Sequence, residues 1–283
     1  MALNTERPSW QQLRAPSDNA TVLNGVQFYL DKRPSATHTY YATQFIESTG
    51  RLMVIGSPGV SGQLFVEPPG DYPFKGDLRS FSFDLSRGDW DAPDHVASFP
   101  GKGDFTACLC VKHPVSDDIY YSRNYGDGWY QWIAAQNRWL RLSGNGRNPW
   151  YCGAAVDPRR NRILTVGGYS ATPPAMLGLD GSNLGLVFTG LGATALTVAG
   201  YPGVVYDEAA ELFLSFHNTP EGRIRVHTVH AENLSVALAP LRGPEPLARP
   251  NGLHNAPQYV PELRGVVLAN SYTGNVLFLR TSN

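Results

Sequence analysis

The chain has 283 residues, 42% of them hydrophobic, and contains 29 glycines and 22 prolines. Its formal net charge is -1 and its basic residues are scattered singly, so it lacks the basic patch that nucleic acid or an anionic membrane requires. The N-terminal residues have no apolar core of signal-peptide length, and no later run approaches the roughly 20 apolar residues that span a bilayer. We expect a cytoplasmic, all-β protein of short strands, without nucleic-acid or membrane partners.

The first candidate strand is PSWQQLR, residues 8–14, which has no partner strand beside it in the sequence. After it, one pattern recurs five times: a strand, a turn rich in Asp, Pro, Gly or Asn, and a second apolar strand. The residue before each turn serves as an anchor, and successive anchors are 67, 44, 50 and 53 residues apart. The anchors are Phe45, Lys112, Val156, Tyr206 and Tyr259. Intervals of this size are typical of propeller blades or solenoids.

A second pattern follows four of these hairpins, in which an apolar residue recurs after seven positions with turn residues between. Each copy is interpreted as a hairpin that joins a third strand to a fourth. The four copies are residues 83–90, 132–139, 179–186 and 229–236. Four antiparallel strands per unit are the blade of a β-propeller.

The ends of the chain complete this interpretation. The fifth unit stops after its third strand, so residues 8–14 are predicted to supply the fourth and close the ring, which buries both exposed sheet edges. The prediction is one β-propeller domain of five four-stranded blades over residues 1–283, with six blades as the alternative. The predicted blades are residues 38–95, with an insertion at 58–77, then 105–145, 150–190, 199–240 and 252–283.

The segment VDPRRNRILTVGG, residues 156–168, resembles the Kelch repeat in its turn, its following apolar strand and its diglycine at Gly167 and Gly168. The NRW sequence at residues 137–139 is similar to the fourth strand of that family. The resemblance implies a Kelch-like propeller. The alternative is an all-β sandwich in which the repeated patterns are accidental.

In four of the five repeats, the residue five positions before the anchor has a ring-bearing side chain. The position holds Tyr40, Ala107, Tyr151, Tyr201 and His254. Equivalent positions on the inner strands point the same way, either into the blades as packing or towards the channel as an aromatic cup. Both interpretations are open at this point.

Histidines add to this face of the propeller. His217 ends a second strand, while His254 and His38 begin first strands, and ring closure would bring their blades together. Imidazole suits acid–base chemistry near neutral pH or a divalent metal. The alternative is that the three histidines are ordinary loop or capping residues. The candidate catalytic residues are His38, His254, Tyr40 and Tyr201.

Loops on the same face carry Asn, Arg and Tyr side chains, the groups with which proteins bind polyols and glycans. Asparagine is also common in ordinary surface turns, which is the alternative explanation. The candidate ligand-binding residues are Tyr151, Arg123, Asn124, Tyr169, His217, Asn255 and Asn270.

The three cysteines, Cys108, Cys110 and Cys152, are an odd number, which favours reduced thiols over a disulfide framework. Cys108 and Cys110 would share one face of a strand, so a thiolate pair for a metal is one interpretation and small buried hydrophobic residues the other. We expect no cofactor, with a divalent metal as the alternative.

The function that these patterns favour is binding, with a small polar molecule, a glycan or a partner protein held on the loop face around the channel. The alternative is an enzyme, a lyase, isomerase or hydrolase, that uses the histidines and tyrosines as acid–base or metal-binding groups. A structural role in a larger assembly is a third interpretation. Because propellers serve all of these functions, the fold does not choose among them.

Overall fold

The computed structural model describes residues 12–17, 22–23, 28–29, 31–34, 39–55, 65–66, 80–100, 109–122, 128–143, 151–243, 245–271 and 275–281. The chain falls into two compact units. The larger contains Thr39–Gln44 and Gly103–Asn283, and the smaller contains Met1–His38 and Phe45–Lys102. Each unit is described by itself.

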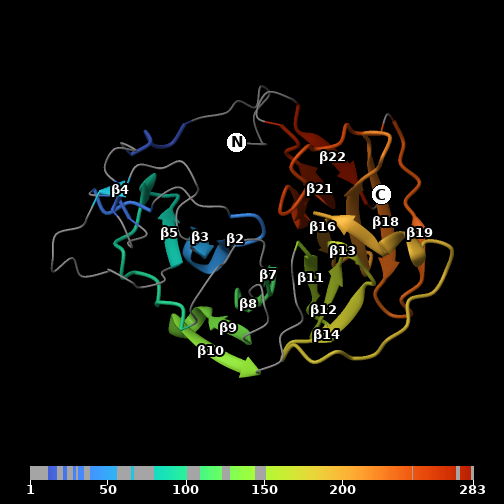
Figure 1. The fold of residues 1–283 in the computed structure, drawn as a ribbon, viewed down its shortest axis with the longest axis horizontal. Coiled ribbons are helices and arrows are strands. Elements are labelled where there is room, and N and C mark those ends of the chain that lie inside the picture. Colours follow the sequence, from blue (N-terminus) through green and yellow to red (C-terminus); the bar gives the residue numbers. More distant parts are fainter. Residues whose placement is uncertain are drawn as a thin grey trace. The chain divides into compact units, whose positions relative to one another are not determined.

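The predicted all-β propeller is confirmed. Five antiparallel sheets of three or four strands form its blades, and no described residue lies in an α-helix (Figure 1). Short 3₁₀ turns cover Glu47–Thr49, Ala134–Gln136, Thr194–Leu196 and Pro261–Leu263. None of the described helical turns is long and apolar enough to span a membrane.

The blades follow one another along the sequence. Blade one contains β2 (Thr43–Ile46), β3 (Arg51–Ile55), β5 (Ser80–Asp84) and β6 (Asp89–Trp90). Blade two contains β7 (Leu109–Lys112), β8 (Ile119–Ser122), β9 (Trp129–Ile133) and β10 (Arg138–Ser143). Blade three contains β11 (Gly153–Asp157), β12 (Arg162–Val166) and β14 (Ala175–Gly178). Blade four contains β16 (Gly203–Asp207), β17 (Leu212–Asn218), β18 (Ile224–His230) and β19 (Val236–Leu238), and blade five contains β20 (Pro257–Val260), β21 (Gly265–Leu268) and β22 (Leu277–Arg280).

Two small sheets stand outside the blades. In the larger unit, β13 (Gly168–Thr172) pairs with β15 (Val198–Gly200). In the smaller unit, β1 (Val22–Leu23) pairs in parallel with β4 (Phe65–Val66), which is the described part of the predicted insertion.

The turn that follows each first strand contains one residue in the left-handed backbone conformation. This residue lies five positions after the anchor in every blade. The φ values are 64° at Gly50, 60° at Asp117, 49° at Asn161, 51° at Glu211 and 49° at Arg264. Because few residues other than glycine and asparagine adopt this conformation easily, its recurrence at one position reflects one turn geometry. The alignment of the five first hairpins is thereby confirmed.

In blades two, three and four this turn is closed by the side chain that directly follows the anchor. The Asp157 carboxylate accepts hydrogen bonds from the backbone nitrogens of the residues two and three positions later, and Asp207 does the same in blade four. In blade two the acceptor is Nδ1 of His113, at 3.2 Å and 3.3 Å from the equivalent nitrogens. His113 is therefore a turn cap.

The predicted second hairpins are confirmed in three blades. Phe83 pairs with Trp90, Trp132 with Trp139, and Val229 with Val236. Each of these hairpins also has a left-handed residue five positions after its first apolar residue: Gly88, Asn137 and Leu234. In these three blades, the two apolar residues seven positions apart therefore form a cross-strand pair.

The chain reverses within residues 179–186 as predicted, but the returning segment forms a β-bridge and not a full strand, so blade three has three strands. After β14 the chain turns at Gly181 (φ 83°), where a β-carbon would lie 2.6 Å from Cγ of Trp129 in blade two. The indole nitrogen of Trp129 donates a hydrogen bond to the Leu179 carbonyl at 2.7 Å. The returning segment pairs with the end of β14: Asn183 bridges to Leu177, the Gly178 nitrogen donates to the Ser182 carbonyl at 2.8 Å, and the Leu184 nitrogen donates to the Met176 carbonyl at 3.0 Å. This pairing is too short to form a fourth strand.

The predicted closing strand lies partly outside the described residues, which include 12–14 but not 8–11. Residues 12–14 are not in a strand, and Arg14 forms an ion pair with Asp89 at 3.2 Å in the smaller unit. Closure of blade five by the N-terminal strand stays a prediction.

The core of the larger unit lies between its blades. The first strands β7, β11, β16 and β20 contact one another in that order, which is the arrangement of inner strands in a propeller. Leu109 and Trp129 pack with Ile163 between blades two and three, and Leu214 and Val266 lie in one cluster between blades four and five. Cys110 and Cys152 are buried, and the Cys152 thiol donates to the Gly167 carbonyl at 2.9 Å, whereas Cys108 lies outside the described residues.

Candidate functional site

Five aromatic side chains from four chain segments gather at the start of the inner strands of the larger unit. We call them the aromatic cluster: Tyr40, Tyr41, Tyr151, Tyr201 and His254. Four of the rings form a closed cycle. Its centroid separations are 5.7 Å for Tyr40–Tyr151, 4.3 Å for Tyr151–Tyr201, 5.1 Å for Tyr201–His254 and 4.9 Å for His254–Tyr40. Tyr41 contacts the cycle edge-to-face through His254, at 4.9 Å.

The backbone that carries the cluster is unusual. Three members have a left-handed conformation, with φ values of 41° at Tyr40, 60° at Tyr151 and 47° at His254. Bulky residues rarely adopt this conformation, and each such residue costs of order 1–3 kcal/mol, so it persists only where surrounding contacts impose it. The recurrence at equivalent positions of three blades shows that one repeated loop geometry carries these rings, and strain of this kind is common at ligand sites.

Hydrogen bonds from outside the cycle hold these residues in place. The Tyr41 hydroxyl donates to the Pro202 carbonyl at 2.8 Å, and the Tyr151 carbonyl lies within 3.2 Å. The Asn255 amide donates to the carbonyls of Tyr41 and Thr43, at 2.7 Å and 2.9 Å. Tyr41 and Asn255 therefore tie segment 39–44 to the starts of blades three, four and five.

Gly252 makes room for Tyr201. Its φ is 85°, and a β-carbon there would lie 2.2 Å from Cβ of Tyr201. The backbone nitrogen of Leu253 donates to the Tyr201 carbonyl at 2.8 Å. The close approach of these two segments places the tyrosine ring beside His254, and only glycine satisfies both the φ and the distance.

His254 is the one ionisable base in the cluster. Nε2 lies 2.8 Å from the Asn251 carbonyl, which can only accept, so this nitrogen carries the proton in the neutral ring. Nδ1 is then an acceptor; it is buried and has no hydrogen-bond partner among the described residues. Burial lowers the pKa of His254 to about 4, with a smaller contribution from the Arg249 charge, against the opposing effect of the Asn251 carbonyl. The imidazole is neutral at pH 7.

Exposure differs within the cluster. Tyr40, Tyr151 and Tyr201 are half-buried, whereas Tyr41 and His254 are 1% and 8% exposed. Three phenol rings therefore present partly exposed surface above a buried base. An arrangement of this kind can stack on a ligand ring and offer polar groups at the ring edges.

The structure brings together four of the predicted site residues, Tyr40, Tyr151, Tyr201 and His254, with Asn255 directly adjacent. His38, Arg123 and Asn124 lie outside the described residues, as does the side chain of Tyr169. Asn270 lies elsewhere in blade five, where its amide donates to the Leu247 carbonyl at 2.6 Å. The ligand-binding role of Asn270, like the roles predicted for the other site residues, stays a prediction.

His217 has a different partner from the one expected. Its ring stacks on His227, with centroids 4.8 Å apart and planes inclined by 8°. Both imidazoles are buried on the face of blade four that packs towards blade three. No group of three His, Cys, Asp or Glu side chains that could hold a metal occurs within the described segments.

Sequence reasoning missed Tyr41 and His227. Tyr41 follows Tyr40 directly, so a doubled tyrosine before an inner strand was the available signal. His227 lies on the strand opposite Ser215 and diagonal to His217, a relation that depends on the register of β17 and β18. Neither the contact of Tyr41 with His254 nor the stacking of His227 on His217 follows from the sequence repeat alone.

No family model matches the sequence, and no curated protein matches it. Similar solved structures include one from a nidogen/laminin complex, with 13% identity and a TM-score of 0.44 over 72% of this chain and 71% of that chain. Another is TolB from Acinetobacter baumannii, with 15% identity and a TM-score of 0.44 over 71% of this chain and 45% of that chain. Neither likeness carries an argument about function.

Proposed function

We propose that this protein is a binding propeller whose aromatic cluster holds a ring of a small polar ligand, a saccharide in the first place. The observation that carries the proposal is the cycle of four aromatic rings, three of them on left-handed residues. Strain repeated in three blades is costly for packing alone, and a preorganised ligand platform accounts for it.

The saccharide class follows from the chemistry of the cluster. A sugar has an apolar face of C–H groups that packs on an aromatic ring, and a rim of hydroxyls that hydrogen-bonds with phenol and imidazole groups. Nδ1 of His254 supplies an acceptor without a partner among the described residues. The neutral, aromatic character of the cluster disfavours a strongly charged ligand.

The test is calorimetric titration with a panel of methyl glycosides and oligosaccharides. We expect at least one saccharide to bind, and Tyr201→Ala to weaken its binding by about twofold to tenfold, because a lost aromatic contact costs about 0.5–1.5 kcal/mol. The matched control is Tyr259→Ala, which removes a half-buried tyrosine outside the cluster. Binding that is unchanged in Tyr201→Ala, or a panel without any ligand, would contradict the proposal.

The neutral His254 also supports a second function, acid–base catalysis on the bound ligand. Its Nδ1, without a partner among the described residues, and its contacts with three tyrosine rings are what a general base with a nearby acid requires. Under this proposal His254→Gln stops conversion of a bound saccharide, followed by NMR, while saccharide binding survives. Full turnover by His254→Gln, or no conversion by the wild-type protein of any saccharide it binds, would exclude it.

A further inference from the structure

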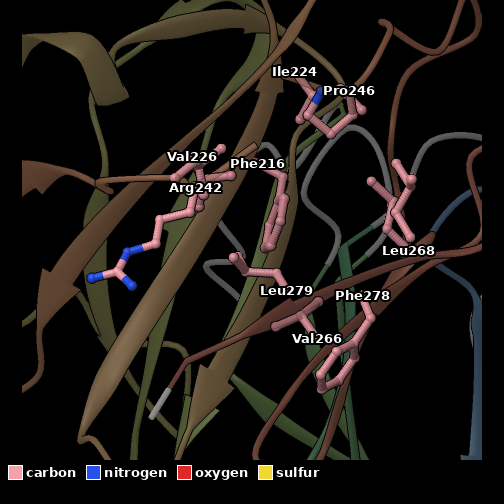
Figure 2. A pocket seen from close by; sticks show the side chains of 11 residues that line it. Phe216, Ile224, Val226, Arg242, Pro246, Val266, Leu268, Phe278 and Leu279 are labelled. Atoms are coloured by element: carbon pink, nitrogen blue, oxygen red, sulfur yellow. The ribbon is translucent and has the colours of Figure 1, made fainter. Parts of the chain in front are cut away.

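A second site lies between blades four and five, away from the aromatic cluster. It is a pocket of about 230 Å³, lined almost entirely by apolar side chains. Phe216 and Val226 come from β17 and β18, Val266 and Leu279 come from β21 and β22, and Leu241 follows β19. Figure 2 shows the side chains from the two blades around a common space.

The rim of this pocket is fixed by the chain that follows β19. The Ile224 nitrogen donates to the Pro246 carbonyl at 2.8 Å, and the Ala239 nitrogen donates to the Val226 carbonyl at 2.9 Å. These bonds tie both ends of the rim segment to β18. The pocket is therefore preformed, and a ligand would not have to order the rim.

One charged residue lines the pocket, Arg242. It lies at one side of the apolar side chains, and its guanidinium group extends away from them (Figure 2). No ion pair of Arg242 occurs within the described part of the chain, in contrast to Arg160 and Arg162, which pair with carboxylates. An apolar space with a lone cation at its edge is complementary to a molecule with an apolar body and an anionic end.

We propose that this pocket binds a small apolar carboxylic acid, with the hydrocarbon body between the blades and the carboxylate at Arg242. An apolar cavity of about 150 Å³ accepts benzene, so 230 Å³ accommodates a phenyl ring with a short chain. The volume is below the roughly 300 Å³ at which pockets for drug-sized ligands begin, which excludes larger ligands. Arginine suits the carboxylate because its planar donors match the two oxygens.

The experiment compares 4-phenylbutyrate with its uncharged analogue 4-phenylbutanol by NMR titration of the full chain. We expect the acid to bind more tightly than the alcohol by up to about fivefold, the upper end of the range for an exposed charge pair. Arg242→Gln should reduce the affinity for the acid to that for the alcohol. Arg138→Gln, which changes an exposed arginine of blade two, should leave both affinities unchanged.

Two further variants test whether the ligand binds in this pocket. Leu277→Trp fills the pocket from its half-buried rim and should abolish binding of both compounds, with folding verified by circular dichroism. Tyr201→Ala in the aromatic cluster should change neither affinity, so this site and the saccharide site are tested independently. Equal binding of acid and alcohol, an unaffected Arg242→Gln, absence of binding, or loss of binding in Tyr201→Ala would each overturn the proposal.

Discussion

Lowering the pH from 7 to 4 is expected to reduce the free energy of unfolding by several kcal/mol, because two buried imidazoles resist protonation in the folded protein. Burial lowers the pKa of His254 to about 4. Burial, with the neighbouring His227 and Arg225, lowers the pKa of His217 to about 4 as well. A pKa difference from 6.5 to about 4 corresponds to on the order of 3 kcal/mol for each imidazole.

The sign follows from proton uptake. Well above pH 6.5 both imidazoles are neutral in the folded and the unfolded chain, so neither contributes to the pH dependence of stability there. Between pH 6.5 and about 4 the unfolded chain binds protons that the folded chain does not, and stability falls as the pH falls. Chemical denaturation at a series of pH values measures this slope.

The variants His254→Gln and His217→Gln should each flatten the profile between pH 6.5 and 4, whatever they do to stability at pH 7. His230→Gln serves as the control, because His230 is half-buried at the end of β18 and outside both imidazole contacts. Profiles that keep the wild-type slope in both variants would show that these two residues titrate normally, contrary to their buried positions.

Replacing Asp157 by alanine is expected to lower the free energy of unfolding by about 3–5 kcal/mol. The carboxylate is 0% exposed and lies 3.2 Å from Nε of Arg162, which is itself buried, and 3.2 Å from a guanidinium nitrogen of Arg160. It also closes the first turn of blade three through two backbone nitrogens. Removing it leaves Arg162 buried without this carboxylate, which is why the loss exceeds that of an ordinary cap.

Denaturant unfolding measures this loss, and Asp180→Ala is the matched control. Asp180 closes an exposed turn through Ser182 and pairs with no arginine among the described residues, so its removal should cost about 1 kcal/mol or less. The loss of stability in Asp157→Asn should lie between those of the two alanine variants, because asparagine keeps an oxygen that accepts the turn's hydrogen bonds but loses the charge that pairs with Arg162. A loss in Asp157→Ala no greater than that in Asp180→Ala would contradict the assignment.

The repeat made the fold predictable from sequence. Each first turn must reverse the chain in the same number of residues, so the left-handed positions recur five residues after anchors as different as Phe45 and Lys112. Apolar pairs such as Trp132 and Trp139 likewise have to face each other across a tight hairpin. Both features are local, and local geometry leaves a regular pattern in the sequence.

Residues 179–186 show where such a pattern fails. The chain reverses there, but the turn is closed between Gly178 and Ser182, and the predicted fourth strand does not form. Gly181 and the Leu179 carbonyl in this turn contact Trp129 of the neighbouring blade. This turn depends on a contact between two blades, and the spacing of apolar residues within one blade does not predict such a contact.

The candidate site was predictable in part. The ring-bearing position before each inner strand correctly brought Tyr40, Tyr151, Tyr201 and His254 to one place. The hydrogen bonds of Tyr41 and the stacking of His217 on its neighbour depend on distances between segments far apart in sequence. Such contacts arise from tertiary packing and have no period.

Binding of a ligand ring by the aromatic cluster is best tested by NMR of protein with carbon-13-labelled tyrosine rings. On addition of the saccharide that binds best, we expect shifts of the ring signals of Tyr40, Tyr151 and Tyr201, assigned by single Tyr→Phe variants. The signals of Tyr206 and Tyr259, which lie within blades four and five, should stay in place. Saccharide binding that leaves the three cluster signals unmoved would show that the ligand binds elsewhere.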